Sequence, residues 1–133
     1  MTLNEVHNKF FCFRNGIVAK AFSDAGAPYK RVFGLQIPDL SRIARETGYD
    51  FALARQLWGE SECRESRLLS YYLFDPELLT MDEAISLAEN TQTREEADIL
   101  AWRLLQRLPY SSELLTRLDG YVAEALRRHI ENQ

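Results

Sequence analysis

The sequence predicts an all-α fold in which about seven short helices form a right-handed α-α superhelix, within a single domain over residues 1–133. Three observations support this prediction. Apolar residues recur at helical spacing, and the four prolines fall between the periodic segments, where they cannot break a helix. In addition, no run of alternating β-branched residues indicates a strand.

The N-terminal part of the chain is expected to form four helices. The first, at residues 3–22, contains Gly16 as a weak point. The second, at residues 38–44, has Pro38 in its first turn, and the fourth, at residues 61–75, has Ser61 as a candidate cap. A long irregular segment separates the first helix from the second, at residues 23–36. The four helices are expected at residues 3–22, 38–44, 51–58 and 61–75.

The C-terminal part is expected to form three more helices. Two of them begin with a Thr followed three residues later by a Glu, which is the pattern of a capping box. The second of these has a continuous apolar face from positions 97, 100, 101, 104, 105 and 108. The three helices are expected at residues 80–88, 93–108 and 112–130.

Consecutive short helices with one apolar face each indicate a stack of the HEAT or tetratricopeptide kind. The sequence has no clean repeat at a fixed period, so a compact helical bundle is the alternative architecture.

The charge distribution argues against a protein built mainly to bind nucleic acid. The chain carries 16 basic and 20 acidic side chains, and residues 41–90 hold five basic and ten acidic ones. Binding to duplex DNA usually depends on a basic stripe, and no such stripe is visible in the sequence, although a fold can gather arginines from separate helices.

Other functional classes have little support in the sequence. It contains no apolar run long enough for a membrane span, no basic leader, no metal-ligand spacing and no phosphate-binding glycine loop. The two cysteines fit reduced thiols in a cytoplasmic protein. We therefore expect no membrane partner, no metal and no cofactor.

Three motifs lie in a fixed order between residues 29 and 105. Residues 29–44 read YKRVFGLQIPDLSRIA, with an aromatic, a Gly, apolar residues and a Pro before an Arg-containing helix start. The pair Leu57-Trp58 is followed by ESRLL at 65–69 and then by Asp-Pro, and the third motif is TREEAD at 93–98. Together they resemble the N-terminal half of the DNA alkylation repair family, HEAT-like bacterial glycosylases that remove alkylated purines.

The resemblance implies roles for individual residues. Asp98 matches the family's aspartate, which supports departure of the positively charged base and would be the catalytic residue here. Arg94 stands where the family has an aromatic that holds the damaged nucleotide, and Arg64 stands where it has a His. The family's chain is also longer, and its further repeats supply another aromatic, an arginine and much of the DNA-binding face. We therefore expect an incomplete cleft.

Each candidate residue also has a structural interpretation. Asp98 and Arg94 are then ordinary charges in the first turns of a helix, Trp58 packs in the core, and Trp102, which lies off the apolar face, covers a neighbouring helix or a partner. Four basic residues either converge on a phosphate or another anion, or are solvated and paired charges. They are Lys30, Arg31, Arg64 and Arg67.

The sequence thus favours a non-catalytic interaction module related to the DNA alkylation repair fold, lacking glycosylase activity and binding a protein partner or a second copy. The alternative is a minimal DNA-binding protein or alkylpurine DNA glycosylase that acts in alkylation damage repair through Asp98, with Arg94 and Trp102 as binding residues.

Overall fold

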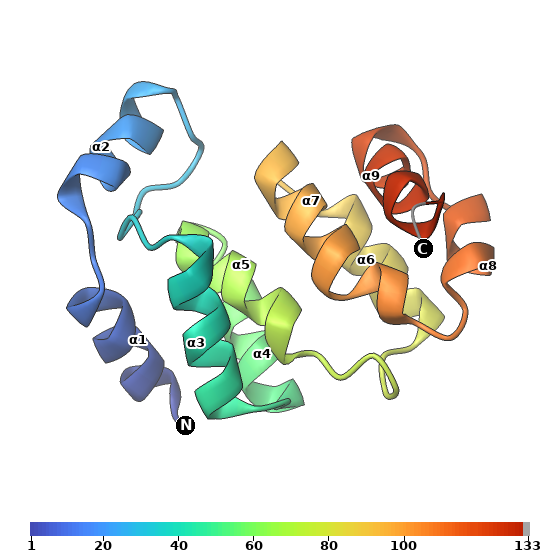
Figure 1. The fold of residues 1–133 in the computed structure, drawn as a ribbon, viewed down its shortest axis with the longest axis horizontal. Coiled ribbons are helices and arrows are strands. Elements are labelled where there is room, and N and C mark those ends of the chain that lie inside the picture. Colours follow the sequence, from blue (N-terminus) through green and yellow to red (C-terminus); the bar gives the residue numbers. More distant parts are fainter. Residues whose placement is uncertain (132–133) are drawn as a thin grey trace. The chain divides into compact units, whose positions relative to one another are not determined.

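The computed structural model describes residues 1–131, which form an all-α fold of nine α-helices and one short 3-10 helix without a strand (Figure 1). The predicted fold class is confirmed. One isolated bridge joins the backbones of Arg31 and Cys63. The elements are α1 (Leu3–Cys12), α2 (Gly16–Asp24), α3 (Ile37–Thr47), α4 (Phe51–Gly59), α5 (Arg64–Leu73), α6 (Met81–Glu89), α7 (Arg94–Arg103), η1 (Leu105–Arg107), α8 (Ser111–Thr116) and α9 (Gly120–Glu131).

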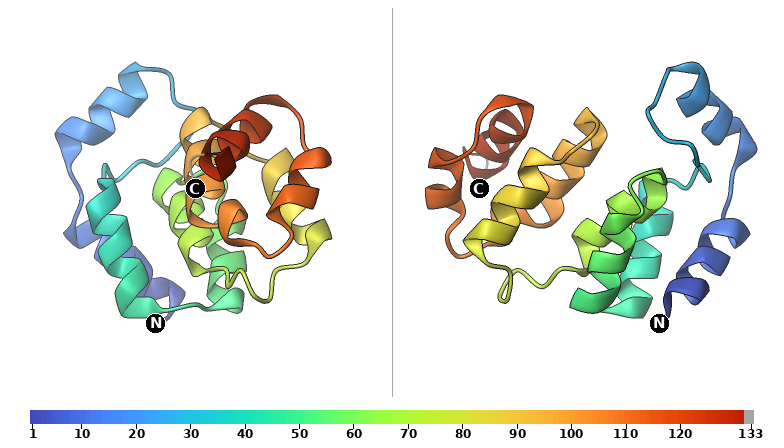
Figure 2. Two further views of the ribbon diagram at one scale, coloured as in Figure 1. Left: turned by 45° about the vertical axis from the view of Figure 1, so that its right-hand side comes forward. Right: turned by 180° about the vertical axis from the view of Figure 1, so that it is seen from behind.

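The chain forms two compact units, Met1–Leu73 and Phe74–Gln133. In the first unit, α5 packs against α3 and α4, and α1 packs against α4 (Figure 2). Every residue of α5 is buried, including Arg64, Glu65 and Arg67. This helix is therefore the centre of the first unit, and its charged residues need partners inside the protein.

The second unit is organised around α7. This helix packs against α9, while α8 contacts both α6 and α9. All six apolar positions predicted for the face at residues 97–108 are buried. The Tyr110 hydroxyl, at the start of α8, donates a hydrogen bond to the Leu79 carbonyl ahead of α6.

Three predicted helix starts are confirmed, two by side-chain caps and one by a proline in the first turn. The Asp50 carboxylate accepts a hydrogen bond from the Leu53 N–H at 3.0 Å, and the Thr80 hydroxyl accepts one from the Glu83 N–H at 3.2 Å. Pro38 lies in the first turn of α3, where its missing N–H costs nothing. Local capping chemistry therefore sets these boundaries.

The prediction of one helix over residues 3–22 is wrong. The chain breaks after Cys12 and restarts at Gly16, because the Asn15 side chain accepts hydrogen bonds from the Ile17 and Val18 N–H groups and caps a new helix. The Asn15 N–H also donates to the Phe33 carbonyl at 2.8 Å, which ties the break to the loop before α3.

Three other boundaries in the predicted pattern are also corrected. The helix expected over residues 112–130 is two helices, since Gly120 adopts a left-handed φ of 70°. The helix ending near residue 108 stops at Arg103 and continues as η1. Ser61 does not begin α5, which starts at Arg64 after a turn over residues 61–63.

A buried carboxylate organises the first unit. Glu65 accepts hydrogen bonds from the N–H groups of Phe33 at 2.9 Å, Gly34 at 3.1 Å and Leu35 at 3.3 Å, and Arg64 Nη1 lies 2.6 Å from its Oε2. Gly34 has a φ of 84°, and a Cβ there would lie 2.2 Å from the Asn15 carbonyl oxygen. This position therefore requires glycine for both its conformation and its close approach.

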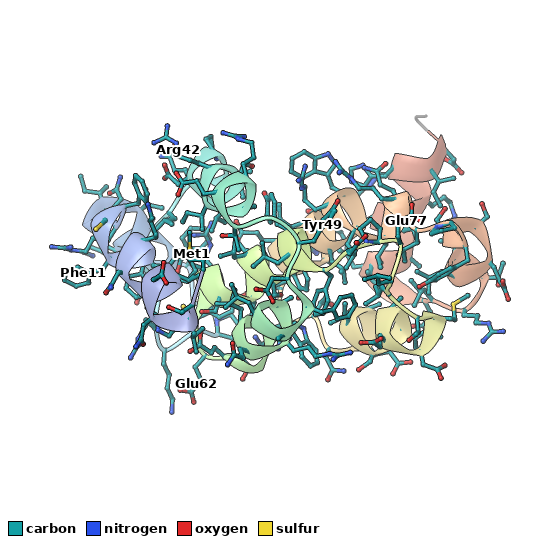
Figure 3. The ribbon with its side chains drawn as sticks, turned by 90° about the horizontal axis from the view of Figure 1, so that it is seen from below. Met1, Phe11, Arg42, Tyr49, Glu62 and Glu77 are labelled. Carbon is teal, nitrogen blue, oxygen red and sulfur yellow. The ribbon has the colours of Figure 1, made fainter. Side chains whose placement is uncertain are left out.

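The helix α2 differs from the others because none of its nine residues is buried. It nevertheless carries apolar side chains, and Ile17 is 85% exposed. Phe11 on α1 is also exposed, and Figure 3 shows it projecting from the outer edge of that helix. The first unit therefore presents apolar surface around the α1–α2 break.

Candidate functional site

The candidate site lies in the second unit, on one stripe of α7. Arg94, Asp98 and Trp102 follow one another at intervals of four residues, so they share one side of the helix. The hydroxyl of Thr93 caps the helix by accepting the Glu96 N–H at 3.1 Å. Three of the residues predicted from the sequence are thus brought onto one face.

Two residues of α9 complete this arrangement, and the sequence interpretation missed both. The Tyr121 hydroxyl lies 3.1 Å from each carboxylate oxygen of Asp98 and donates to them. Arg128 Nη2 lies 3.5 Å from Asp98 Oδ1 and 3.4 Å from the Tyr121 hydroxyl oxygen. We call Arg94, Asp98, Tyr121 and Arg128 the α7–α9 cluster.

Arginines flank the tyrosine ring in this cluster. The guanidinium carbon of Arg94 lies 4.8 Å from the centroid of the Tyr121 ring, and that of Arg128 lies 5.6 Å from it. The hydrogen bond with Tyr121, and then the charges of Asp98 and Glu124, raise the pKa of Arg128. Both arginines are cationic. Arg128 contacts the Asp98 carboxylate and is also near the charge of Glu124, whereas Arg94 lies over the Tyr121 ring.

Trp102 extends the same stripe of α7 beyond the cluster. It is 37% exposed, and the Arg103 guanidinium carbon lies 5.2 Å from the centroid of its ring. Its backbone carbonyl accepts a hydrogen bond from Gln106 Nε2 at 2.7 Å, which links the end of α7 to η1. A partly exposed indole with a nearby guanidinium is suited to stacking on a flat ligand.

The four predicted anion-binding residues of the first unit divide into two pairs. Lys30 and Arg31 are exposed and line a pocket of about 600 Å³ together with Glu60, Glu62 and Cys63. Lys30 Nζ lies 3.3 Å from Glu62 Oε1. This pocket therefore mixes both signs of charge and is not a simple basic site.

The other pair is buried and engaged within the protein. Arg64 donates to the Leu35 carbonyl at 2.9 Å and contacts Glu65, and its guanidinium carbon lies 4.1 Å from the Phe22 ring centroid. Arg67 donates to the Trp58 carbonyl at 2.9 Å and stacks on that indole. The structure does not bring these two arginines onto an exposed face with Lys30 and Arg31.

Residues 1–131 contain no group of three or more His, Cys, Asp or Glu side chains arranged to hold a metal ion. Over the same residues, no helix combines the length and apolar character that crossing a membrane requires.

A solved structure of similar architecture supports this fold. Neither the family models nor the curated proteins compared with the sequence match it. One solved structure has a TM-score of 0.86 to this chain at 12% identity, over 98% of this chain and 57% of that one. It represents a new family of proteins related to the HEAT-like repeat DNA glycosylases, with affinity for branched DNA structures.

The chain has the HEAT-like repeat fold. This confirms, at the level of the fold, the resemblance to the alkylpurine glycosylases seen in the motifs. The chain spans a little over half the length of the solved structure that it matches.

Proposed function

We propose that this HEAT-like protein is a DNA-binding module without glycosylase activity, and that DNA contacts it at the α7–α9 cluster. The observation that carries the proposal is the pairing of one carboxylate, Asp98, with two arginines around a tyrosine ring. Guanidinium groups bind phosphate oxygens through charge-assisted, often bidentate hydrogen bonds. The affinity of the similar solved structure's family for branched DNA supports the choice of ligand.

The same geometry argues against excision of alkylated purines. A catalytic aspartate must offer its charge to the developing cation on the sugar. Here the Asp98 carboxylate already accepts the Tyr121 hydroxyl and contacts Arg128. Arg94 and Arg128 would also repel a positively charged base. We therefore expect Asp98 to position its neighbours rather than to act in catalysis.

DNA binding is tested by fluorescence anisotropy with labelled four-way junction and linear duplex of equal length, over a series of salt concentrations. We expect binding at low salt, and expect the substitutions Arg94→Ala and Arg128→Ala each to reduce the salt slope by about one. The matched control is Arg45→Ala, an exposed arginine on α3. Absence of binding to either DNA at low salt would refute the proposal.

The absence of glycosylase activity is tested with methylated duplex DNA. We expect the wild-type protein to release no alkylated purine. Release that is abolished by Asp98→Asn would instead establish the glycosylase alternative, because that substitution removes the charge and keeps the size of the side chain.

A protein partner or a second copy is the other candidate ligand, and a different surface favours it. The helix α2 has nine residues, too few to be stable without packing, yet it buries none of them and exposes Ile17. Light scattering after size exclusion tests self-association at micromolar concentration. A dimer that Ile17→Asp dissociates would support it, and a strictly monomeric protein would refute it.

A further inference from the structure

We propose that Trp102 stacks on an unpaired base, so that the preferred ligand is DNA in which an unpaired base adjoins a duplex. This inference rests on the proposed DNA binding at the α7–α9 cluster and specifies the substrate class of that site. Fully paired duplex presents its base faces only to one another, and an indole can stack only on a base that has left the duplex.

The position of Trp102 on α7 supports this assignment. Eight residues separate it from Arg94, which corresponds to about 12 Å along the helix axis. Phosphates of one B-form strand follow each other at about 3.4 Å along the duplex axis, so the stripe spans three to four nucleotides. A strand whose phosphates contact Arg94 and Arg128 therefore reaches Trp102 within a few nucleotides.

The chemistry around the indole agrees with this function. The guanidinium carbon of Arg103 lies 5.2 Å from the ring centroid, and Arg107 on η1 is exposed. Combining an aromatic platform with arginines is how proteins bind unpaired nucleotides without reading their sequence. The other exposed aromatic residues, Phe11 and Tyr49, lie in the first unit, away from the α7–α9 cluster along the chain.

The experiment compares two labelled DNAs of equal length and charge, one a perfect duplex and the other with a short unpaired stretch at its centre. Trp102→Ala should weaken binding to the DNA with unpaired bases by roughly 5- to 150-fold, the range measured for the loss of one stacking contact. Binding to the perfect duplex should change little. Trp102→Phe should retain part of the preference, because a smaller ring still stacks.

The control for a general loss of aromatic surface is Tyr49→Ala. Tyr49 is 56% exposed, and Figure 3 shows it in the first unit, on the connection between α3 and α4. This substitution should leave both affinities unchanged. Circular dichroism confirms that each variant is folded.

Tryptophan fluorescence gives an independent measurement. The chain contains two tryptophans, so Trp58→Phe leaves Trp102 as the single emitter. Stacking on a base should quench this emission on addition of the DNA with unpaired bases and much less with the perfect duplex.

The outcomes separate the inference from the proposed function. If neither DNA binds, the proposed function fails and the inference fails with it. If both DNAs bind but Trp102→Ala weakens them equally, or weakens neither, the protein is a DNA-binding module and Trp102 is not its base-stacking residue. Equal quenching by both DNAs would also overturn the inference.

Discussion

Replacement of Glu65 by Gln is expected to destabilise the first unit strongly. The Glu65 side chain is fully buried, and its carboxylate accepts three backbone N–H groups as well as contacting Arg64. An amide of the same shape removes the charge and turns one acceptor into a donor, which leaves Arg64 without its buried counter-ion. Removing one partner of a buried ion pair costs about 3–5 kcal/mol. The lost hydrogen bonds belong to the same carboxylate, so this figure already includes their cost.

Urea unfolding followed by far-UV circular dichroism at neutral pH measures this loss. Because a domain of this size is stable by about 5–15 kcal/mol, the midpoint should fall markedly. The control is Glu62→Gln, whose carboxylate lies 3.3 Å from Lys30 on the surface and should contribute less than about 1 kcal/mol. A loss below about 1 kcal/mol for Glu65→Gln would refute the view that this carboxylate organises the unit.

Three further predictions concern stability. Gly34→Ala should cost more than Gly26→Ala, since both glycines have positive φ but only Gly34 lies against another backbone; urea midpoints of the two variants measure the difference. Burial raises the pKa of the Cys63 thiol, so the free energy of unfolding should begin to fall above about pH 8.5, where the thiol of the unfolded chain ionises first, and Cys63→Ala should remove this contribution. We also predict one domain: tryptophan fluorescence, with one tryptophan in each unit, and circular dichroism should report a single coincident transition, whereas separate transitions would indicate two independent domains.

Most helices could be predicted because local chemistry determines them. Apolar spacing identified the buried face of α7, and capping boxes identified the starts of α6 and α7. The helices predicted over residues 3–22 and 112–130 are each two helices in the structure. The sequence contains a recognisable helix-breaking pair at both breaks. Asn15-Gly16 and Asp119-Gly120 each pair a capping residue with a flexible one, and this pairing outweighs the apolar spacing that continues across it.

The site was less predictable because tertiary packing assembles it. Motif resemblance selected Arg94 and Asp98, and the helical period places Trp102 with them. No sequence pattern connects these residues to Tyr121 and Arg128, which reach Asp98 from α9, 23 and 30 residues away. Arg64 and Arg67 show the reverse case: their positive charge suggested an exposed anion site, but burial of the whole of α5 directs them to internal partners.

The two functions considered for this chain assign different roles to the residues beside Asp98. The family resemblance places at position 94 an aromatic that holds the damaged nucleotide. In this chain Arg94 occupies that position, and the ring comes from Tyr121, whose hydroxyl is hydrogen-bonded to the carboxylate. Under the proposed function, the acid holds Tyr121 and Arg128 in place. Tyr121→Phe should therefore weaken DNA binding through misplacement of Arg128, with no effect on base release, and a variant that binds DNA like the wild type would contradict this role for Asp98.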